Sequence, residues 1–117
     1  MNFKKLKKSF MHAGKGIKFV FNNEQNFRMQ VAASVVVLFL AASIPVQKNE
    51  AIILGFLVVL VLILELFNTA VEYLLDVVNP RLSEQVQIIK DIMAAMVLSA
   101  AAFAVIIGCT IFIPYFL

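Results

Sequence analysis

Long apolar runs alternate with short polar segments along most of the chain, and this pattern predicts three membrane-spanning helices. The first run is closed by Pro45, and the second continues from Ala51 to Leu64 without a charged residue. Crossing a hydrocarbon core of about 30 Å takes about 20 residues of helix. A soluble helical bundle would instead spread its polar residues along every helix. We therefore place the three spans at about residues 26–45, 51–78 and 91–113.

Residues 1–22 have a different pattern, because apolar and basic residues fall on opposite sides of a single helix. The apolar side consists of Phe3, Leu6, Phe10, Ala13, Ile17, Val20 and Phe21. The basic side includes Lys4, Lys5, Lys8, Lys15 and Lys18. Such a helix is expected to lie on the membrane surface, with phenylalanines in the acyl boundary and lysines at anionic headgroups. The predicted fold class is all-α: an integral membrane protein with three transmembrane helices and an N-terminal amphipathic surface helix.

The composition agrees with a membrane protein of one domain. The chain has 117 residues, of which 62% are hydrophobic and 15% are charged, outside the usual balance of a soluble domain. Its one cysteine, Cys109, excludes a disulfide framework or a zinc cluster within a single chain. The N-terminal lysines are not followed by a compact apolar stretch with a cleavage site, so we expect no removable signal peptide. Residues 1–117 are predicted to form a single domain.

The basic residues are unevenly distributed, and their distribution predicts the orientation. Seven of the ten precede residue 29, one lies in the loop 46–50, and two lie between the second and third spans. Loops rich in Lys and Arg stay on the cytoplasmic side of a membrane. We expect a multi-pass protein of the cell membrane with a cytoplasmic N-terminus. Asn79-Pro80 should end the second span, and a cytoplasmic turn should follow from Arg81 to Lys90.

A polar stripe on the second span is the strongest candidate for chemistry. Four residues spaced i, i+3, i+7 and i+11 lie along one side of that helix: Glu65, Asn68, Glu72 and Asp76. An ionisable residue within a span costs roughly 2.5 to 3.5 kcal/mol on insertion scales, so a cluster of them needs a reason. Glu24, ahead of the first span, and Lys90-Asp91, ahead of the third, are expected at the same cytoplasmic level.

The residues alone leave two interpretations of this stripe open. Polar groups in spans are suited to interhelical hydrogen bonds and ion pairs, as in a noncatalytic membrane module. An excess of carboxylates favours a bound cation, and Mg²⁺ is normally held by one or two carboxylates together with substrate phosphates. Glu24 and Glu72 fit that role, and Lys90 is suited to neutralising phosphate oxygens. The chain has no G-x-x-x-x-G-K-[ST] loop, so any nucleotide must be held differently.

The stripe and the Lys90-Asp91 pair together resemble the signature of the prokaryotic diacylglycerol kinase family, which includes the undecaprenol kinases. The residues that carry the resemblance are E-x-x-N-[ST]-A-x-E at 65–72 and the following K-D. The resemblance extends to Lys15-Gly16 and to residues 23–28, so it covers nearly the whole chain in order. The asparagine-rich segment N-N-E-Q-N-F-R looks closer to undecaprenol kinases of Gram-positive bacteria than to the Gram-negative diacylglycerol kinases.

This resemblance implies a homotrimer with active sites at subunit interfaces, in which each site transfers the γ-phosphate of magnesium ATP to a lipid hydroxyl. It implies Glu65 as the general base on that hydroxyl, assisted by Asn68, which would orient the site. Arg28, together with Glu65, would contact the lipid substrate. The implied metal ligands are Glu24 and Glu72. The implied ATP contacts are His12, Glu24, Glu72, Lys90 and Asp91.

Three segments depart from the family's usual pattern: Arg81-Leu82-Ser83, Gln87-Ile88-Ile89 and Met96. The expected function is phosphorylation of undecaprenol to undecaprenyl phosphate. Diacylglycerol is the alternative lipid, and a noncatalytic assembly module is the alternative of another class. The expected partners are a membrane lipid, ATP, Mg²⁺ and further copies of the chain, with no nucleic acid.

Overall fold

The computed structural model describes residues 2–78 and 83–117, which are almost entirely helical. Four helices follow one another: α1 (Phe3–Asn23), α2 (Gln25–Ser43), α3 (Lys48–Val78) and α4 (Glu84–Phe116). Within these described residues there is no strand. α2, α3 and α4 are each long and apolar enough to cross a membrane. The predicted all-α fold, with three transmembrane helices and an additional N-terminal helix, is confirmed.

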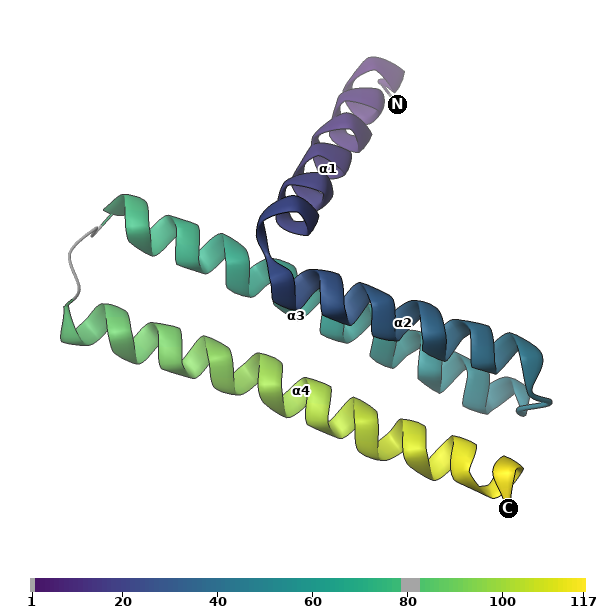
Figure 1. Cartoon of the computed structure of the whole chain (residues 1–117). Helices are drawn as coiled ribbons and strands as arrows, with labels where there is room; N and C mark the ends of the chain where they lie inside the picture. The colour runs from purple at the N-terminus through teal and green to yellow at the C-terminus, as the bar shows by residue number, and fades with distance from the viewer. Residues whose placement is uncertain (1, 79–82) are drawn as a thin grey trace.

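The three spanning helices lie side by side, with α3 packed against both α2 and α4 (Figure 1). α1 leaves this bundle at a steep angle near the middle of α3 (Figure 1). Most apolar side chains of the spans face outward, and Phe39, Phe56 and Leu98 are 68%, 67% and 72% exposed. Lipid can solvate such side chains, so a small buried core suffices. The central position of α3 allows its polar residues to meet groups from the neighbouring helices.

The spans differ from their predicted limits mainly at α4. This helix begins at Glu84 rather than near Asp91, so residues 84–90, which we predicted as part of a turn, are helical. The early start has a physical cause, because the Ser83 hydroxyl accepts a hydrogen bond from the backbone nitrogen of Val86 at 3.2 Å and caps the helix. Glu84 adds an acidic residue to the first turn, where the helix dipole favours one.

The other helix ends also shift. α4 continues through Pro114 to Phe116 instead of ending at 113, and Pro114 removes only the backbone hydrogen bond that its own nitrogen would have donated. α3 begins at Lys48 rather than 51, and α2 covers Gln25–Ser43 rather than 26–45. The predicted stop at Asn79-Pro80 and the turn residues 81–82 lie outside the described residues.

A bend at Glu24 separates α1 from the first span. Glu24 has extended backbone angles, with φ −118° and ψ 111°, so α1 ends and α2 begins around it. Arg28 braces the bend, because its Nη1 donates a hydrogen bond to the carbonyl oxygen of Phe21 at 2.8 Å. The rings of Phe19 and Tyr73 meet edge to face with centroids 5.3 Å apart, which fixes the end of α1 to α3. The bend therefore keeps Glu24 beside the bundle.

A second link joins the opposite end of α3 to α4. The Glu50 carboxylate accepts a hydrogen bond from the backbone nitrogen of Gln47 at 2.9 Å and another from the hydroxyl of Tyr115. The first of these bonds caps the start of α3. The second connects the first turn of α3 to the last turn of α4. Glu50 is thus a structural carboxylate on the same helix that carries the polar stripe.

Candidate active site

The centre of the candidate site is Glu65 on α3, whose side chain is 2% exposed. Its carboxyl group interacts with the side-chain amide of Gln30 on α2 and lies within electrostatic range of the Glu24 and Glu72 carboxylates. Thr69 is equally buried, but its hydroxyl donates to the backbone oxygen of Glu65 at 3.0 Å and leaves the carboxylate free. Burying a carboxylate among other carboxylates is unfavourable, so the arrangement calls for a reason beyond packing.

Groups from the bend, α2 and α3 meet around Glu65. Glu72 lies about two turns along α3 and accepts a hydrogen bond from Nδ2 of Asn68 at 3.4 Å. Glu24 approaches from the bend that precedes α2, and its electrostatic influence reaches Glu65. The structure thus brings together four of the predicted site residues: Glu24, Glu65, Asn68 and Glu72.

Lys90 and Asp91 lie farther along the bundle. Lys90 forms an ion pair with Asp76, with 3.3 Å between Nζ and Oδ1, and Asp91 accepts a hydrogen bond from Nε2 of Gln87 at 2.8 Å. Eleven residues separate Asp76 from Glu65 on α3, which is about 16 Å of helix rise. α4 therefore supplies a basic partner for Asp76, the last residue of the stripe. Within this chain, Lys90 lies at the Asp76 end of the stripe.

The two remaining predicted residues lie on or near α1. His12 is exposed on α1, one residue before Ala13, which lines a groove between α1 and α3. Arg28 is also exposed, and its guanidinium group is engaged with the backbone of Phe21 at the bend. The structure thus gives Arg28 a role in holding the bend, and its predicted contact with lipid stays a prediction.

The donor set can be compared with what Mg²⁺ requires. No group of three or more His, Cys, Asp or Glu side chains suited to a metal ion occurs among the described residues. Mg²⁺ does not need one, since one or two carboxylates, several waters and the phosphates of a substrate complete its shell. Glu24 and Glu72 offer oxygen ligands, and neither is ion-paired with a base within residues 2–78 and 83–117. The residues present fit a magnesium ion that is shared with a nucleotide.

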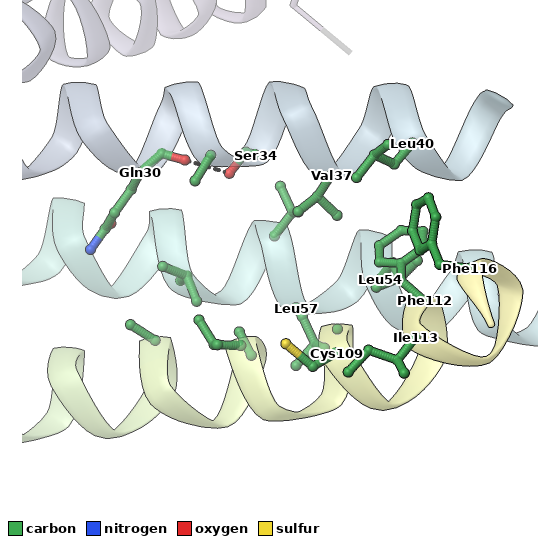
Figure 2. A pocket seen from close by; sticks show the side chains of 17 residues that line it. Gln30, Ser34, Val37, Leu40, Leu54, Leu57, Cys109, Phe112, Ile113 and Phe116 are labelled. Atoms are coloured by element: carbon green, nitrogen blue, oxygen red, sulfur yellow. Dashed lines mark hydrogen bonds between the residues drawn. The ribbon is translucent and has the colours of Figure 1, made fainter. Parts of the chain in front are cut away.

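An apolar cavity of about 400 Å³ lies between α2, α3 and α4 (Figure 2). Its wall is built mainly from aliphatic and aromatic side chains, among them Leu54, Leu57 and Phe112. Gln30 and Phe116 lie at opposite ends of the cavity (Figure 2). Val61, one turn before Glu65 on α3, also lines it. The cavity therefore ends next to the buried carboxylate.

Gln30 is the functional candidate that the sequence did not reveal. Its backbone oxygen accepts a hydrogen bond from the Ser34 hydroxyl at 2.7 Å (Figure 2). Its side-chain Oε1 is buried and has no hydrogen-bond partner within the described part of the chain. An unpaired buried acceptor costs about 1–3 kcal/mol. A lone glutamine near a span end is usually assigned to the membrane interface, and only the packing of α2 on α3 places it at Glu65.

Comparison with known proteins identifies the family of this chain. The profile of the family described as "Prokaryotic diacylglycerol kinase" matches residues 11–112, which is most of the chain. The chain belongs to the prokaryotic diacylglycerol kinase family. The matched range includes all the predicted site residues, and the resemblance read from the residues is confirmed. With it the predicted class of enzyme, a lipid kinase, is also confirmed, and a kinase implies ATP as the phosphate donor.

Three relatives illustrate the range of the prokaryotic diacylglycerol kinase family. The chain is 36% identical over 107 residues to a diacylglycerol kinase of Synechocystis, covering 91% of this chain but 61% of that protein's length. It is 35% identical over 107 residues to the undecaprenol kinase of Bacillus subtilis, covering 92% and 87% of the two chains. The diacylglycerol kinase of Escherichia coli K12 is 29% identical over 114 residues, covering 97% and 93%. These relatives support a kinase over a noncatalytic membrane module.

Proposed function

We propose that this protein phosphorylates undecaprenol, using magnesium ATP, to give undecaprenyl phosphate. The observation that carries the proposal is Glu65: a carboxylate buried on a spanning helix, beside an amide and two further carboxylates rather than a cation. The asparagine-rich segment at 22–28 and the similarity to the Bacillus enzyme favour undecaprenol. The similarity to the Synechocystis enzyme supports diacylglycerol as the second candidate lipid.

In the proposed reaction, Glu65 acts as the general base. The oxygen of the lipid hydroxyl attacks the γ-phosphorus of ATP, its proton passes to the Glu65 carboxylate, and ADP leaves as the bond to the β-phosphate oxygen breaks. Asn68 orients the site through its hydrogen bond to Glu72. Burial keeps bulk water away from the Glu65 carboxylate, and the apolar cavity beside it would admit a membrane alcohol.

Glu24 and Glu72 are proposed to hold Mg²⁺ jointly with the phosphates of ATP. The ion would supply neutralisation of the charge that develops on the phosphate oxygens. These carboxylates come from the bend and from α3, so the bend braced by Arg28 sets the separation of the two ligands. Arg28 is proposed to lie near the entrance for the lipid substrate as well.

His12, Lys90 and Asp91 are proposed as further contacts of the nucleotide. In one protomer Lys90 lies at the Asp76 end of α3, away from Glu65. A homotrimer with active sites at subunit interfaces would allow a second protomer to contribute these groups. We propose this assembly, with residues 1–117 as one domain, α1 on the membrane surface and the N-terminus on the cytoplasmic side where ATP is available. The concentration of basic residues before residue 29 supports that orientation.

The test is incubation of the purified protein with labelled ATP and Mg²⁺ in the presence of undecaprenol, diacylglycerol or a short-chain alcohol. We expect label in the undecaprenol product at a higher kcat/KM than with diacylglycerol. Preferred labelling of diacylglycerol would identify diacylglycerol as the substrate and would leave the proposed phosphate transfer unchanged. Transfer to none of the three would refute the proposed activity.

A further inference from the structure

The neutral side chain that interacts with the Glu65 carboxylate is the amide of Gln30. Among the described residues the carboxylate has two other neighbours of like charge, Glu24 and Glu72, and both repel it. The amide of Gln30 is the one side chain there that stabilises its charge. A general base must present one oxygen to the proton it removes while its orientation is fixed from another side. Gln30 is in a position to provide that fixing contact.

The chemistry of the two groups sets the orientation of the amide. An ionised carboxylate only accepts hydrogen bonds, so the amide nitrogen of Gln30 must face Glu65 and the amide oxygen must face elsewhere. That oxygen is the buried Oε1 without a partner, and Gln30 lines the apolar cavity between α2, α3 and α4. Leaving an acceptor unpaired is unfavourable, and an aliphatic side chain at position 30 would avoid it. Packing alone does not account for a glutamine here.

The neutrality of the donor also matters for the reaction. A lysine or arginine in place of Gln30 would hold the carboxylate equally well, but its charge would stabilise the ionised form and weaken the base. An amide donor restrains the carboxylate and leaves it more basic than an ion pair would. This combination suits a group that must collect a proton from an alcohol.

We propose that Gln30 is a positioning residue of the kinase reaction, which orients the Glu65 carboxylate toward the lipid hydroxyl through its side-chain amide nitrogen. The inference rests on the proposed role of Glu65 as general base. It adds a residue of α2 that interacts with Glu65 itself. A lipid bound at the end of the cavity would meet a carboxylate whose orientation is already fixed.

The test compares steady-state kinetics of Gln30→Met and Gln30→His with a matched control, Ser34→Ala. Methionine fills nearly the same volume without a donor, and histidine keeps a ring nitrogen that can donate at a similar reach. Ser34 lies one turn away on the same side of α2, and its hydroxyl donates to the backbone oxygen of Gln30. We expect Gln30→Met to lower kcat by about 10- to 100-fold, as misplacement of a reacting group does. The KM values for lipid and ATP should stay near those of the wild type.

Recovery of kcat in Gln30→His distinguishes a positioning role of Gln30 from a role in helix packing. At a pH where its imidazole is neutral, Gln30→His should regain most of the lost kcat, and Ser34→Ala should keep the wild-type value. Wild-type kcat in Gln30→Met, an equal loss in Ser34→Ala, or no recovery in Gln30→His would each overturn the inference. If Gln30→Met fails to fold, Gln30→His decides: near wild-type activity supports the inference, and a loss comparable to that of Glu65→Gln overturns it.

Glu65→Gln in the same assay distinguishes failure of the positioning role of Gln30 from failure of the proposed function. Full activity of Glu65→Gln would refute both the role of Glu65 as general base and the positioning role of Gln30. An inactive Glu65→Gln together with a fully active Gln30→Met would be consistent with the proposed function and would refute only the positioning role of Gln30.

Discussion

Replacing Glu65 by glutamine separates a catalytic from a structural role of the buried carboxylate. The substitution is nearly isosteric and removes the basic oxygen, while the new amide can still form hydrogen bonds with the side chain of Gln30. A catalytic carboxylate predicts a folded protein that has lost phosphate transfer. A structural carboxylate predicts a protein whose helices no longer hold together.

The expected magnitudes follow from burial and from the role of the base. Loss of a general base typically lowers a rate by about 10²- to 10⁴-fold. Stability should change in the opposite direction, because a charged residue at the centre of a span costs about 2.5–3.5 kcal/mol and a neutral amide avoids part of that cost. Glu65 is 2% exposed and has two carboxylates nearby, so relief of repulsion adds to this effect. The unfolding free energy of Glu65→Gln should be unchanged or higher.

The same helix provides the matched control, Glu50→Gln. Glu50 caps α3 and accepts the hydroxyl of Tyr115, so its loss weakens the link between α3 and α4. We expect Glu50→Gln to lower the thermal stability and to leave the transfer rate per folded protein unchanged. The two variants carry an identical chemical change on one helix, with opposite consequences.

The assay pairs transfer of label from ATP to undecaprenol with thermal unfolding of the same detergent-solubilised samples. Retention of transfer by Glu65→Gln would refute the role of the base. Loss of folded protein in Glu65→Gln comparable to that in Glu50→Gln would show that the buried carboxylate is structural.

Three further outcomes are expected. Lys90→Met should raise the KM for ATP, whereas Asp76→Asn, which breaks the same ion pair, should leave it unchanged. Both variants should change the unfolding free energy by less than about 1 kcal/mol, because the pair is partly exposed. An equal rise in KM for ATP in both variants would contradict the role of Lys90 in nucleotide binding. Phe19→Ala should release α1 from α3 and increase proteolysis of residues 3–23, because the aromatic pair contributes about 0.5–1.5 kcal/mol beyond its buried area. Tyr73→Phe keeps the ring contact and should not increase proteolysis. Removing Mg²⁺ with a chelator should abolish transfer reversibly, and Glu72→Gln should raise the Mg²⁺ concentration needed for half-maximal rate; an unchanged requirement would argue against Glu72 as a ligand.

The fold was largely predictable from the sequence because each span is a long apolar run, and the bilayer leaves a helix as the natural way to bury it. The limits of the spans were less predictable. Residues 84–90 are polar enough to resemble a turn, yet the Ser83 cap and the acidic first turn start α4 there. That capping signal was present in the sequence. A hydropathy pattern alone does not detect it.

The site was predictable only along one helix. The spacing of Glu65, Asn68 and Glu72 fixes their common side, because the helical period is set by backbone hydrogen bonds. Which side of α2 meets that stripe depends on how the two helices pack, and a sequence of apolar residues leaves this register open. Gln30 was missed for this reason. The pairing of Lys90 with Asp76 likewise required the position of α4 beside α3.

The central claim is that carboxylates from separate segments, Glu24 and Glu72, share one metal ion beside Glu65. Metal-directed cleavage tests this most directly: Fe²⁺ replaces Mg²⁺ in the presence of ATP, peroxide and ascorbate are added, and the cut positions are mapped by mass spectrometry. We predict ATP-dependent cuts near both residue 24 and residue 72, suppressed by excess Mg²⁺. Cuts that fall only in other parts of the chain, with both of these segments intact, would contradict the shared site.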